Sequence, residues 1–333
     1  MVKMRIHCKY YLTILSCIPI LLMSQEQSSG RINLTQQQWF GNAICYSGYR
    51  ENQNPDSNTC PSQAQILEDF KILQRHWTLI RTYGSDQHSR DILEVIRREK
   101  LHLCVMLGAW LSAEPGNESN NAKQITECIR LANEYRDIVI AVSVGNEVLV
   151  DWSNHKVPED KMIQYVKQVK AAVHVPVTVD DDFMFWMTRG SKLANEVDFV
   201  STHMYPLWGK HDIDSGFAVT VRLYDLVKAA LPKKPIIIGE AGWATYTVGN
   251  LHAPKAGTEK KQKRYFEELS SWAQTNNITV FFFEAFDEPW KGEGTEGHWG
   301  LFSVLRKAKF AMQQWYPELM PTGPTSPSYE DKK

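Results

Sequence analysis

Eight short stretches of the sequence are dominated by apolar residues, many of them β-branched, and they recur at intervals over most of the chain. Runs of this length without polar alternation are typical of parallel strands that are buried on both faces. The predicted strands cover residues 39–46, 77–83, 101–107, 138–144, 175–179, 197–203, 235–239 and 278–283.

Segments with apolar residues at helical spacing lie between most of these runs. In the first of them, Ile66, Phe70 and Leu73 recur on one face, and Pro61 and Ser62 precede it as residues that commonly begin a helix. The predicted helices cover residues 63–75, 89–98, 121–136, 158–172, 216–231 and 258–275.

The alternation of strands with helices implies a parallel sheet in an α/β protein. Eight such units match a single-domain (β/α)8 TIM barrel, which typically takes ~250 residues. A doubly wound open sheet is the alternative, but it normally carries a glycine-rich turn after the first strand. That position reads Tyr46-Ser47-Gly48-Tyr49-Arg50, which is not such a turn, so we favour the barrel.

The charge balance and the cysteines exclude several classes of function. The chain has 37 basic and 38 acidic residues and no basic stripe, which argues against a nucleic-acid partner and favours a neutral substrate. Cys45, Cys60, Cys104 and Cys128 lack the spacing of metal sites, and no zinc-protease or phosphate-loop motif is present in the sequence. We therefore predict no metal and no cofactor, and we expect a monomer.

The N-terminal residues have the order of a secretory signal peptide. Lys3, Arg5 and Lys9 are basic, residues 10–23 are mostly apolar, and polar residues follow. The apolar stretch is short for a transmembrane helix. We predict a signal peptide over residues 1–28, with its cleavage site left open.

The mature protein is therefore expected to be secreted or periplasmic, without an integral membrane span. Lipid anchoring at Cys17 to an outer surface is an alternative, because residues 14–17 resemble a lipoprotein box. The barrel domain is predicted over residues 36–318, and a flexible tail over residues 319–333.

Two of the predicted strands run directly into a glutamate. The fourth strand is followed by Asn146 and Glu147, and the seventh ends at Gly239 and Glu240. A carboxylate at the C-terminal end of a barrel strand lies where such folds keep their catalytic groups. Two carboxyl groups at one rim are also what cleavage of a glycosidic bond requires.

The two glutamates can be given different roles on physical grounds. If their carboxylates lie ~5–5.5 Å apart, as in retaining glycosidases, they repel by about 3 kcal/mol at an effective dielectric near 20, or roughly 2 pKa units. One carboxyl then keeps a proton while the other is ionised. We assign Glu147 as acid/base, because Asn146 beside it can bind the sugar 2-hydroxyl, and Glu240 as nucleophile. Tyr205 or His203 could orient the nucleophile.

The remaining strand ends carry further aromatic and charged residues. We expect substrate contacts from residues at or just beyond these ends. They are Tyr46, Arg81, Tyr83, Trp110, Asn146, Asp182, Tyr205, Trp243, Glu288 and Lys291.

Several of these segments together resemble glycoside hydrolase family 17, the β-1,3-glucanases and β-1,3-glucanosyltransferases. The motifs run through nearly all of the predicted mature chain. They are Cys45-Tyr46-Ser47-Gly48-Tyr49-Arg50, Ile80-Arg81-Thr82-Tyr83, Ser143-Val144-Gly145-Asn146-Glu147, Ile238-Gly239-Glu240-Ala241-Gly242-Trp243, Phe283-Glu284-Ala285-Phe286-Asp287-Glu288-Pro289-Trp290-Lys291 and Trp299-Gly300-Leu301-Phe302.

This resemblance implies a (β/α)8 retaining enzyme that cleaves β-1,3-glucan of the laminarin type, and a bacterial-type member of the family. It implies Glu147 as acid/base and Glu240 as nucleophile, with Glu288 and Lys291 near the pair. Bacterial-type members tend to carry Glu-Pro-Trp after the fifth strand, where this chain has Asp181-Asp182-Phe183. The departure bears on neighbouring sugar contacts and leaves the cleavage chemistry unchanged.

Other functions remain open at this stage. Hydrolysis is the first choice, and a β-1,3-glucanosyltransferase would use the same residues. A non-catalytic glucan-binding barrel would share the aromatic residues but would not need the two glutamates. A phosphate-binding barrel would need a glycine-rich turn where Gly239-Glu240-Ala241-Gly242 supplies a carboxylate.

Three local patterns each have two interpretations. Asp180-Asp181-Asp182 could bind a divalent metal, but we favour a solvated strand end whose last residue touches sugar. Residues 292–297 match G-x-G-x-x-G literally, yet they open no predicted helix, so we interpret them as a flexible loop. Six tryptophans are either core residues or sugar platforms, namely Trp110, Trp186, Trp208, Trp243, Trp290 and Trp299.

Overall fold

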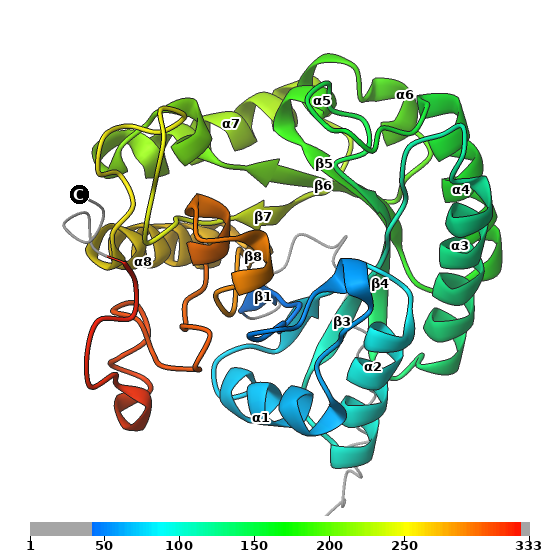
Figure 1. The fold of residues 1–333 in the computed structure, drawn as a ribbon. Helices are drawn as coiled ribbons and strands as arrows, with labels where there is room; N and C mark the ends of the chain where they lie inside the picture. Colours follow the sequence, from blue (N-terminus) through cyan, green and yellow to red (C-terminus); the bar gives the residue numbers. More distant parts are fainter. Residues whose placement is uncertain (1–41, 328–333) are drawn as a thin grey trace, which may run out of the picture. The chain divides into compact units, whose positions relative to one another are not determined.

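The eight strands close into one parallel barrel (Figure 1). The computed structural model describes residues 42–327. Each strand pairs with the next in chain order, and the first pairs with the last. This closure confirms the (β/α)8 barrel and excludes the doubly wound sheet. The strands are β1 (Ala43–Cys45), β2 (Leu79–Arg81), β3 (Cys104–Ala109), β4 (Val139–Asn146), β5 (Val177–Asp182), β6 (Val200–Met204), β7 (Ile236–Ala241) and β8 (Val280–Phe282).

The helices surround the strands (Figure 1). All six predicted helices are present, with ends displaced by a few residues. They are α1 (Gln63–Leu73), α2 (Gln87–Glu99), α3 (Glu118–Glu134), α4 (Glu159–Ala172), α7 (Ile213–Ala230) and α8 (Glu259–Asn276).

Two short helices in the segment after β5 were not predicted. They are α5 (Phe183–Thr188) and α6 (Ser191–Ala194). Neither is long enough to establish a helical period of apolar residues. The side chain of Asp182 begins α5, because its Oδ1 accepts a hydrogen bond from the Met184 N–H at 2.8 Å.

The packing inside the barrel explains the glycine before Glu240. Asp180 of β5 and Ser201 of β6 are fully buried. A Cβ atom on Gly239 would lie 2.3 Å from Ser201 Oγ and 2.5 Å from Asp180 Oδ1, so only glycine fits there. Gly239 therefore lets β7 pass these side chains and deliver Glu240 to the rim.

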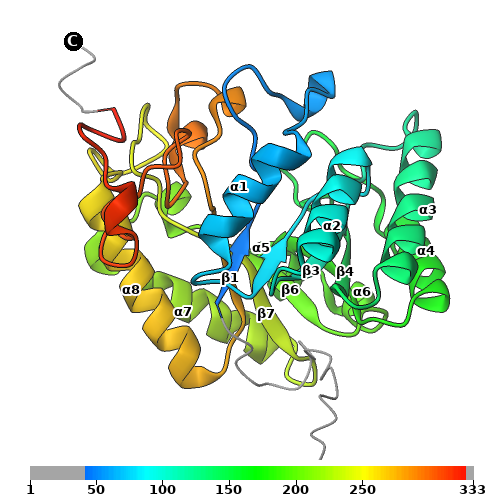
Figure 2. The same ribbon diagram turned by 90° about the horizontal axis from the view of Figure 1, so that it is seen from below.

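The segments that follow the C-terminal ends of β1 and β8 lie at the same end of the barrel (Figure 2). Those after β8 include the short helices η3 (Pro289–Lys291) and η4 (Thr295–His298). The segment after β1 includes η1 (Pro55–Ser57). Candidate residues from distant parts of the sequence therefore gather around one opening.

Buried ion pairs attach the C-terminal segment to the barrel. The Arg306 guanidinium binds both carboxylate oxygens of Asp69 on α1 at 2.7 Å. Lys309 Nζ lies 2.6 Å from Asp287 Oδ1. Part of the predicted tail is also described, and Ser326 Oγ lies 2.7 Å from Thr245 Oγ1.

The predicted signal peptide lies outside the described residues, as does the end of the tail, so the domain boundaries stay predictions. Among the helices of residues 42–327, none combines the length and the apolar character needed to cross a membrane.

Candidate active site

A turn in the backbone brings Glu147 to the mouth of the barrel. The register between β4 and β5 shifts between Ser143 and Asn146. Gly145 and Glu147 then both adopt positive φ values, of 89° and 50°. For a residue with a side chain this left-handed conformation is uncommon, and it is often found at functional sites. The Glu147 N–H donates to the Asp180 carbonyl at 2.9 Å, which fixes the turn.

The carboxylate of Glu240 is held by donors from two other strands. Arg81 Nη1 of β2 donates to Oε1 at 2.5 Å, and the Tyr205 hydroxyl, just after β6, donates to Oε2 at 2.5 Å. The same guanidinium donates to Asp180 at 2.6 Å and to Asn146 Oδ1 at 2.5 Å. Arg81 is almost fully buried, so this network fixes Glu240 rigidly.

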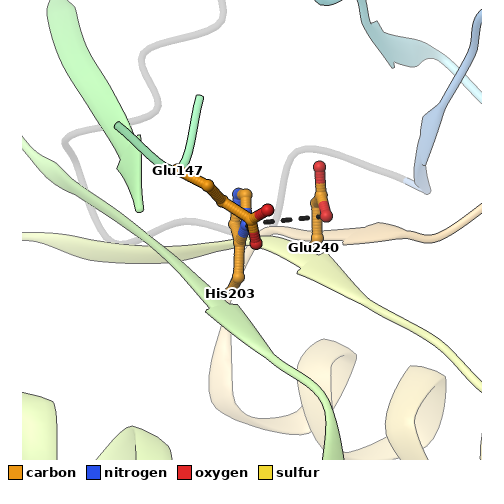
Figure 3. Close-up of side chains that lie close together, drawn as sticks. All are labelled: Glu147, His203 and Glu240. Atoms are coloured by element: carbon orange, nitrogen blue, oxygen red, sulfur yellow. Dashed lines mark hydrogen bonds and ion pairs between the residues drawn. The ribbon is translucent and has the colours of Figure 1, made fainter. Parts of the chain in front are cut away.

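Glu147, His203 and Glu240 converge at the centre of the opening (Figure 3). One potential ligand atom from each of the three lies within 4.8 Å of those of the other two. His203 Nδ1 lies 2.9 Å from Glu147 Oε1 and 3.5 Å from Glu240 Oε2. The structure therefore brings together the two glutamates that the sequence singled out, and adds a histidine between them.

The charges around Glu240 decide its protonation state. Burial raises its pKa, but the positive charges of His203 and Arg81, with the hydrogen bonds from Tyr205 and Arg81, outweigh burial and lower the pKa to about 2. Glu240 is therefore ionised near neutral pH. The ionisation of Glu240 therefore follows from two neighbouring cations, and not from repulsion between the two glutamates alone.

A cleft of about 960 Å³ surrounds this centre. Most of the expected substrate residues line it, on segments that follow seven of the eight strands. Those residues are Tyr46, Tyr83, Trp110, Asn146, Asp182, Tyr205, Glu288 and Lys291, together with Glu147 and Glu240.

Two expected substrate residues do not line the cleft. Trp243 is fully buried, its Nε1 donates to the Ala256 carbonyl at 3.0 Å, and its ring packs on Tyr265 of α8. Arg81 directs its guanidinium at Asp180, Glu240 and Asn146. Direct substrate contact is therefore wrong for both, because Trp243 packs beneath the rim and Arg81 acts on Glu240.

The three consecutive aspartates are not a solvated strand end. Asp180 and Asp181 are fully buried, and Asp181 accepts hydrogen bonds from the N–H groups of Leu149 and Asp182 at 2.9 Å. Burial raises the pKa of Asp181 to about 8 and that of Asp182 to about 6. Only Asp182 reaches the cleft.

A second charged cluster lies in the wall of the same cleft. Lys291 Nζ is 2.6 Å from Glu288 Oε2 and 3.5 Å from Glu284 Oε1, and the Ser47 hydroxyl also donates to Glu288. Burial raises the pKa of Glu284, and the adjacent Glu288 raises it further. Glu288 is only 1% exposed, so this is a buried part of the cleft wall and not a surface ion pair.

The tryptophans divide between core and cleft. Trp186 and Trp243 are core residues, whereas Trp110, Trp208 and Trp290 line the cleft, and Trp299 is a buried core residue that also borders it. Trp110 stacks on His155, with ring centroids 4.9 Å apart.

Sequence reasoning missed Trp152, which lines the cleft and is 62% exposed. It lies in a segment between β4 and α4 without periodic pattern, so no signal distinguished it. Glu296, in the glycine-rich segment 292–297, also lines the cleft, on the short helix η4.

Glu147, His203 and Glu240 are grouped closely enough to be tested as a metal site, and within residues 42–327 no other such group is present. The atoms of these residues that approach one another already have partners within the protein. Arg81 and Tyr205 bind the two oxygens of Glu240, and His203 binds Glu147. The Arg81 guanidinium lies 2.5 Å from Glu240 Oε1 and would repel a metal cation bound there. We therefore do not assign these three residues as metal ligands.

A (β/α)8 barrel with two carboxyl groups this close at its rim is the arrangement of retaining glycoside hydrolases. The sequence matches the family described as the BtgE/BtgC glycoside hydrolase domain over residues 43–300, and the chain belongs to that family.

Relatives with curated names are glucan-degrading enzymes. A glucan 1,3-beta-glucosidase of Arthroderma benhamiae is 28% identical over 278 residues, which is 78% of this chain and 87% of the relative. The glucan endo-1,3-beta-glucosidase btgC of Emericella nidulans is 25% identical over 77% of this chain. The chain spans only 43% of that btgC protein, and similar shares of other btgC relatives.

Solved structures agree with this assignment. An endo-laminarinase from Formosa Hel1_33_131 superposes with a TM-score of 0.77 at 28% identity, covering 91% of this chain and 93% of its own. A Rhizomucor miehei beta-1,3-glucanosyltransferase in complex with laminaritriose gives a TM-score of 0.70 at 22% identity, covering 81% and 96%, which supports the fold alone. The bacterial-type assignment stays a prediction.

Proposed function

We propose that this protein cleaves β-1,3-glucan with retention of configuration, with Glu240 as nucleophile and Glu147 as acid/base. The observation that carries the proposal is the approach of the two carboxyl groups, whose oxygens lie within 4.8 Å. Retaining glycosidases separate their carboxyl groups by ~5–5.5 Å, whereas inverting enzymes need ~6.5–9.5 Å to admit a water molecule.

The environments of the two glutamates support their roles. Glu240 is ionised, and a carboxylate is required to attack the anomeric carbon. Arg81 and Tyr205 hold it in place, so little reorganisation precedes the attack. Glu147 is the more exposed of the two, with 18% of its side chain accessible against 6% for Glu240. It can therefore reach the leaving oxygen and, later, an incoming water.

The reaction follows in two steps. In the first, the Glu240 carboxylate forms a bond to the anomeric carbon, the glycosidic bond breaks, and Glu147 supplies the proton to the leaving oxygen. In the second, water attacks the anomeric carbon, Glu147 takes its proton, and the ester bond to Glu240 breaks. Two inversions at one carbon give net retention.

The substrate class is supported by the relatives and by the cleft. The named relatives and the Formosa structure act on 1,3-β-glucan or laminarin according to their names. The cleft wall includes exposed aromatic rings such as Trp110, and apolar faces of sugar rings pack on such surfaces.

Transglycosylation is a second candidate that uses the same intermediate. Trp110 is 40% exposed and Trp152 is 62% exposed, and both lie on segments that follow β3 and β4, on the side of Glu147. The leaving sugar departs on this side, so the same surface can bind a sugar acceptor in place of water. Products longer than the starting laminari-oligosaccharide would establish this activity.

Rescue by azide tests the two roles separately. In Glu240→Ala, azide can occupy the space of the lost nucleophile and should yield an α-glycosyl azide. In Glu147→Ala, azide replaces water in the second step and should yield a β-glycosyl azide. The opposite pairing would reverse the two assignments. Full activity of Glu240→Gln would exclude Glu240 as nucleophile, and binding without turnover in the wild type would indicate a non-catalytic glucan-binding barrel.

We also propose that the protein is exported, as the basic and apolar order of its first residues indicates. N-terminal sequencing of the protein from culture medium and from cell fractions tests this. Recovery of the intact N-terminus inside the cell would contradict it.

A further inference from the structure

His203 occupies the point where the two catalytic carboxyl groups meet. It extends from β6, it is fully buried, and its Nδ1 lies 2.9 Å from Glu147 and 3.5 Å from Glu240. Its Nε2 is buried and has no hydrogen-bond partner in the described part of the chain. The ring therefore exchanges a proton with its neighbours through Nδ1 alone, which means with the carboxyl groups.

We propose that His203 and Glu147 together hold the single proton that passes to the leaving oxygen, so that the hydrogen-bonded pair, and not Glu147 alone, retains this proton in the site. His203 is then a positioning residue for the proton, and Glu147 remains the group that contacts the substrate. The inference rests on the proposed role of Glu147 as acid/base.

The proton balance of the pair is simple. With one proton to share, the pair exists either as imidazolium and carboxylate or as neutral imidazole and carboxylic acid, and the proton moves along the 2.9 Å hydrogen bond. During the first step the pair loses this proton to the leaving oxygen as the glycosidic bond breaks and the ester of Glu240 forms. During the second step it regains one from the attacking water.

The charges that face His203 favour its protonated form overall. The carboxylates of Glu147, which follows β4, and of Glu240 on β7 raise the pKa of His203. The positive charge of Arg81 on β2 lowers it. Burial lowers the pKa of His203, but the two carboxylates outweigh burial and raise it to about 9. Because His203 Nδ1 is hydrogen-bonded to Glu147 Oε1, loss of the proton from His203 removes the proton that the pair shares.

The carboxyl groups of Asp181 and Asp182 of β5 also interact electrostatically with His203. Burial raises the pKa of Asp181 to about 8, which is close to the alkaline step expected for the pair. The experiment must therefore separate the two groups.

The test is the pH dependence of kcat/KM on a laminari-oligosaccharide for the full-length protein. In His203→Asn, Glu147 must hold the proton alone, so the alkaline limb should move to lower pH by about one unit or more. Asp181→Asn should leave the limb in place. His76→Asn, which removes a histidine packed against Trp77 and Trp315 outside the cleft, is the matched control. An unmoved limb in His203→Asn, or a moved one in Asp181→Asn, overturns the proposal.

A substrate with an activated leaving group distinguishes a role of His203 in supplying the proton from a purely structural role. A dinitrophenyl β-glycoside of a laminari-oligosaccharide leaves without protonation, so His203→Asn should keep its kcat/KM within a few-fold of the wild type there. Equal losses on both substrates at every pH would mean that His203 only supports the fold of the site, and would overturn the inference.

Two further measurements address a variant that fails to fold and a failure of the proposed catalytic function. If His203→Asn does not fold, NMR of the wild-type protein with ¹⁵N-labelled histidine replaces it, and a His203 ring whose ¹⁵N shifts do not change across the alkaline limb overturns the proposal. Glu240→Gln is assayed in parallel. Its loss of activity alongside an unmoved limb in His203→Asn rejects only the histidine inference, whereas its full activity rejects the proposed catalytic function.

Discussion

Glu147 and Glu240 lie within 4.8 Å of each other, yet their surroundings differ in kind. Glu240 sits at the end of β7, and its two oxygens are bound by Arg81 of β2 and by Tyr205, which follows β6. Glu147 follows its strand in a left-handed turn, is more exposed, and contacts His203. Donors from several parts of the barrel therefore fix the charge of Glu240, while Glu147 stays accessible for proton exchange.

Replacing either of the two carboxyl groups should have the largest effect on activity. Glu240→Gln should lower kcat/KM roughly 10⁴-fold on both a laminari-oligosaccharide and an activated dinitrophenyl glycoside, because no nucleophile remains. Glu147→Gln should lose as much on the oligosaccharide but far less on the activated glycoside, since that leaving group needs no proton. Steady-state kinetics on the two substrates checks both, and equal losses for Glu147→Gln on both would contradict its role.

Removing Arg81 should have the next largest effect, on activity and on stability. Arg81→Met leaves Asp180 and Glu240 buried without their cation, which should lower the free energy of unfolding by about 3–5 kcal/mol. The pKa of Glu240 should rise from about 2 toward the ordinary value of 4.5, so the acidic limb of kcat/KM should move to higher pH. Urea unfolding and pH profiles measure the two effects.

The sign of the pH dependence follows from the lowered pKa of Glu240. A carboxyl group with a lower pKa in the folded state adds stability above its unfolded pKa, near 4.5, and loses it as the pH falls toward 2. Arg81→Met should therefore lose less stability over this acidic range than the wild type. Arg97→Met, which removes an exposed ion pair with Asp137, should behave like the wild type.

Tyr205→Phe should have a smaller effect, because it removes one hydrogen-bond donor to Glu240 and keeps the aromatic ring. A hydrogen bond to a charged group contributes about 1.5–3 kcal/mol, so kcat/KM should fall roughly 10–100-fold. Tyr224→Phe, on α7 against Trp272 and away from the cleft, is the matched control. A change below two-fold in Tyr205→Phe would show that this donor does not act on the nucleophile.

The smallest effect is expected from removing an exposed aromatic ring of the cleft. Trp152→Ala removes an exposed ring from the cleft and should raise KM for long laminari-oligosaccharides by about 2–10-fold, because ring stacking contributes about 0.5–1.5 kcal/mol. Transglycosylation products should decline more than hydrolysis products. Trp315→Ala, which removes a partly exposed tryptophan outside the cleft, should leave KM unchanged, and a wild-type KM in Trp152→Ala would exclude a sugar contact there.

The sequence was sufficient for the fold because buried parallel strands leave long apolar runs that recur with the helices. It was insufficient for α5 and α6, since helices of four to six residues show no period. Strand ends in a parallel barrel meet at one rim, and this rule alone brought Glu147 and Glu240 together. It could not place Arg81 on Glu240, because that contact depends on side-chain directions inside a closed barrel.

Trp243 illustrates the same limit. An aromatic residue just beyond a strand either faces the cleft or packs beneath the rim, and the sequence does not distinguish the two. The surroundings decide it here, because Trp243 fills space above Gly216 of α7, where a Cβ atom would lie 2.4 Å from the indole ring. The register shift between β4 and β5 likewise has no sequence signal beyond Gly145, yet it turns Glu147 toward the cleft.

The stereochemistry of the first product distinguishes retention from inversion at the anomeric carbon. A proton NMR spectrum recorded during the first minutes of cleavage of a reduced laminari-oligosaccharide resolves the anomer that is released before mutarotation. Two carboxyl groups this close, with Glu240 attacking the anomeric carbon, predict the β-anomer as the first product. An initial α-anomer would mean that water attacks the sugar directly, and would contradict the assignment of Glu240 as nucleophile.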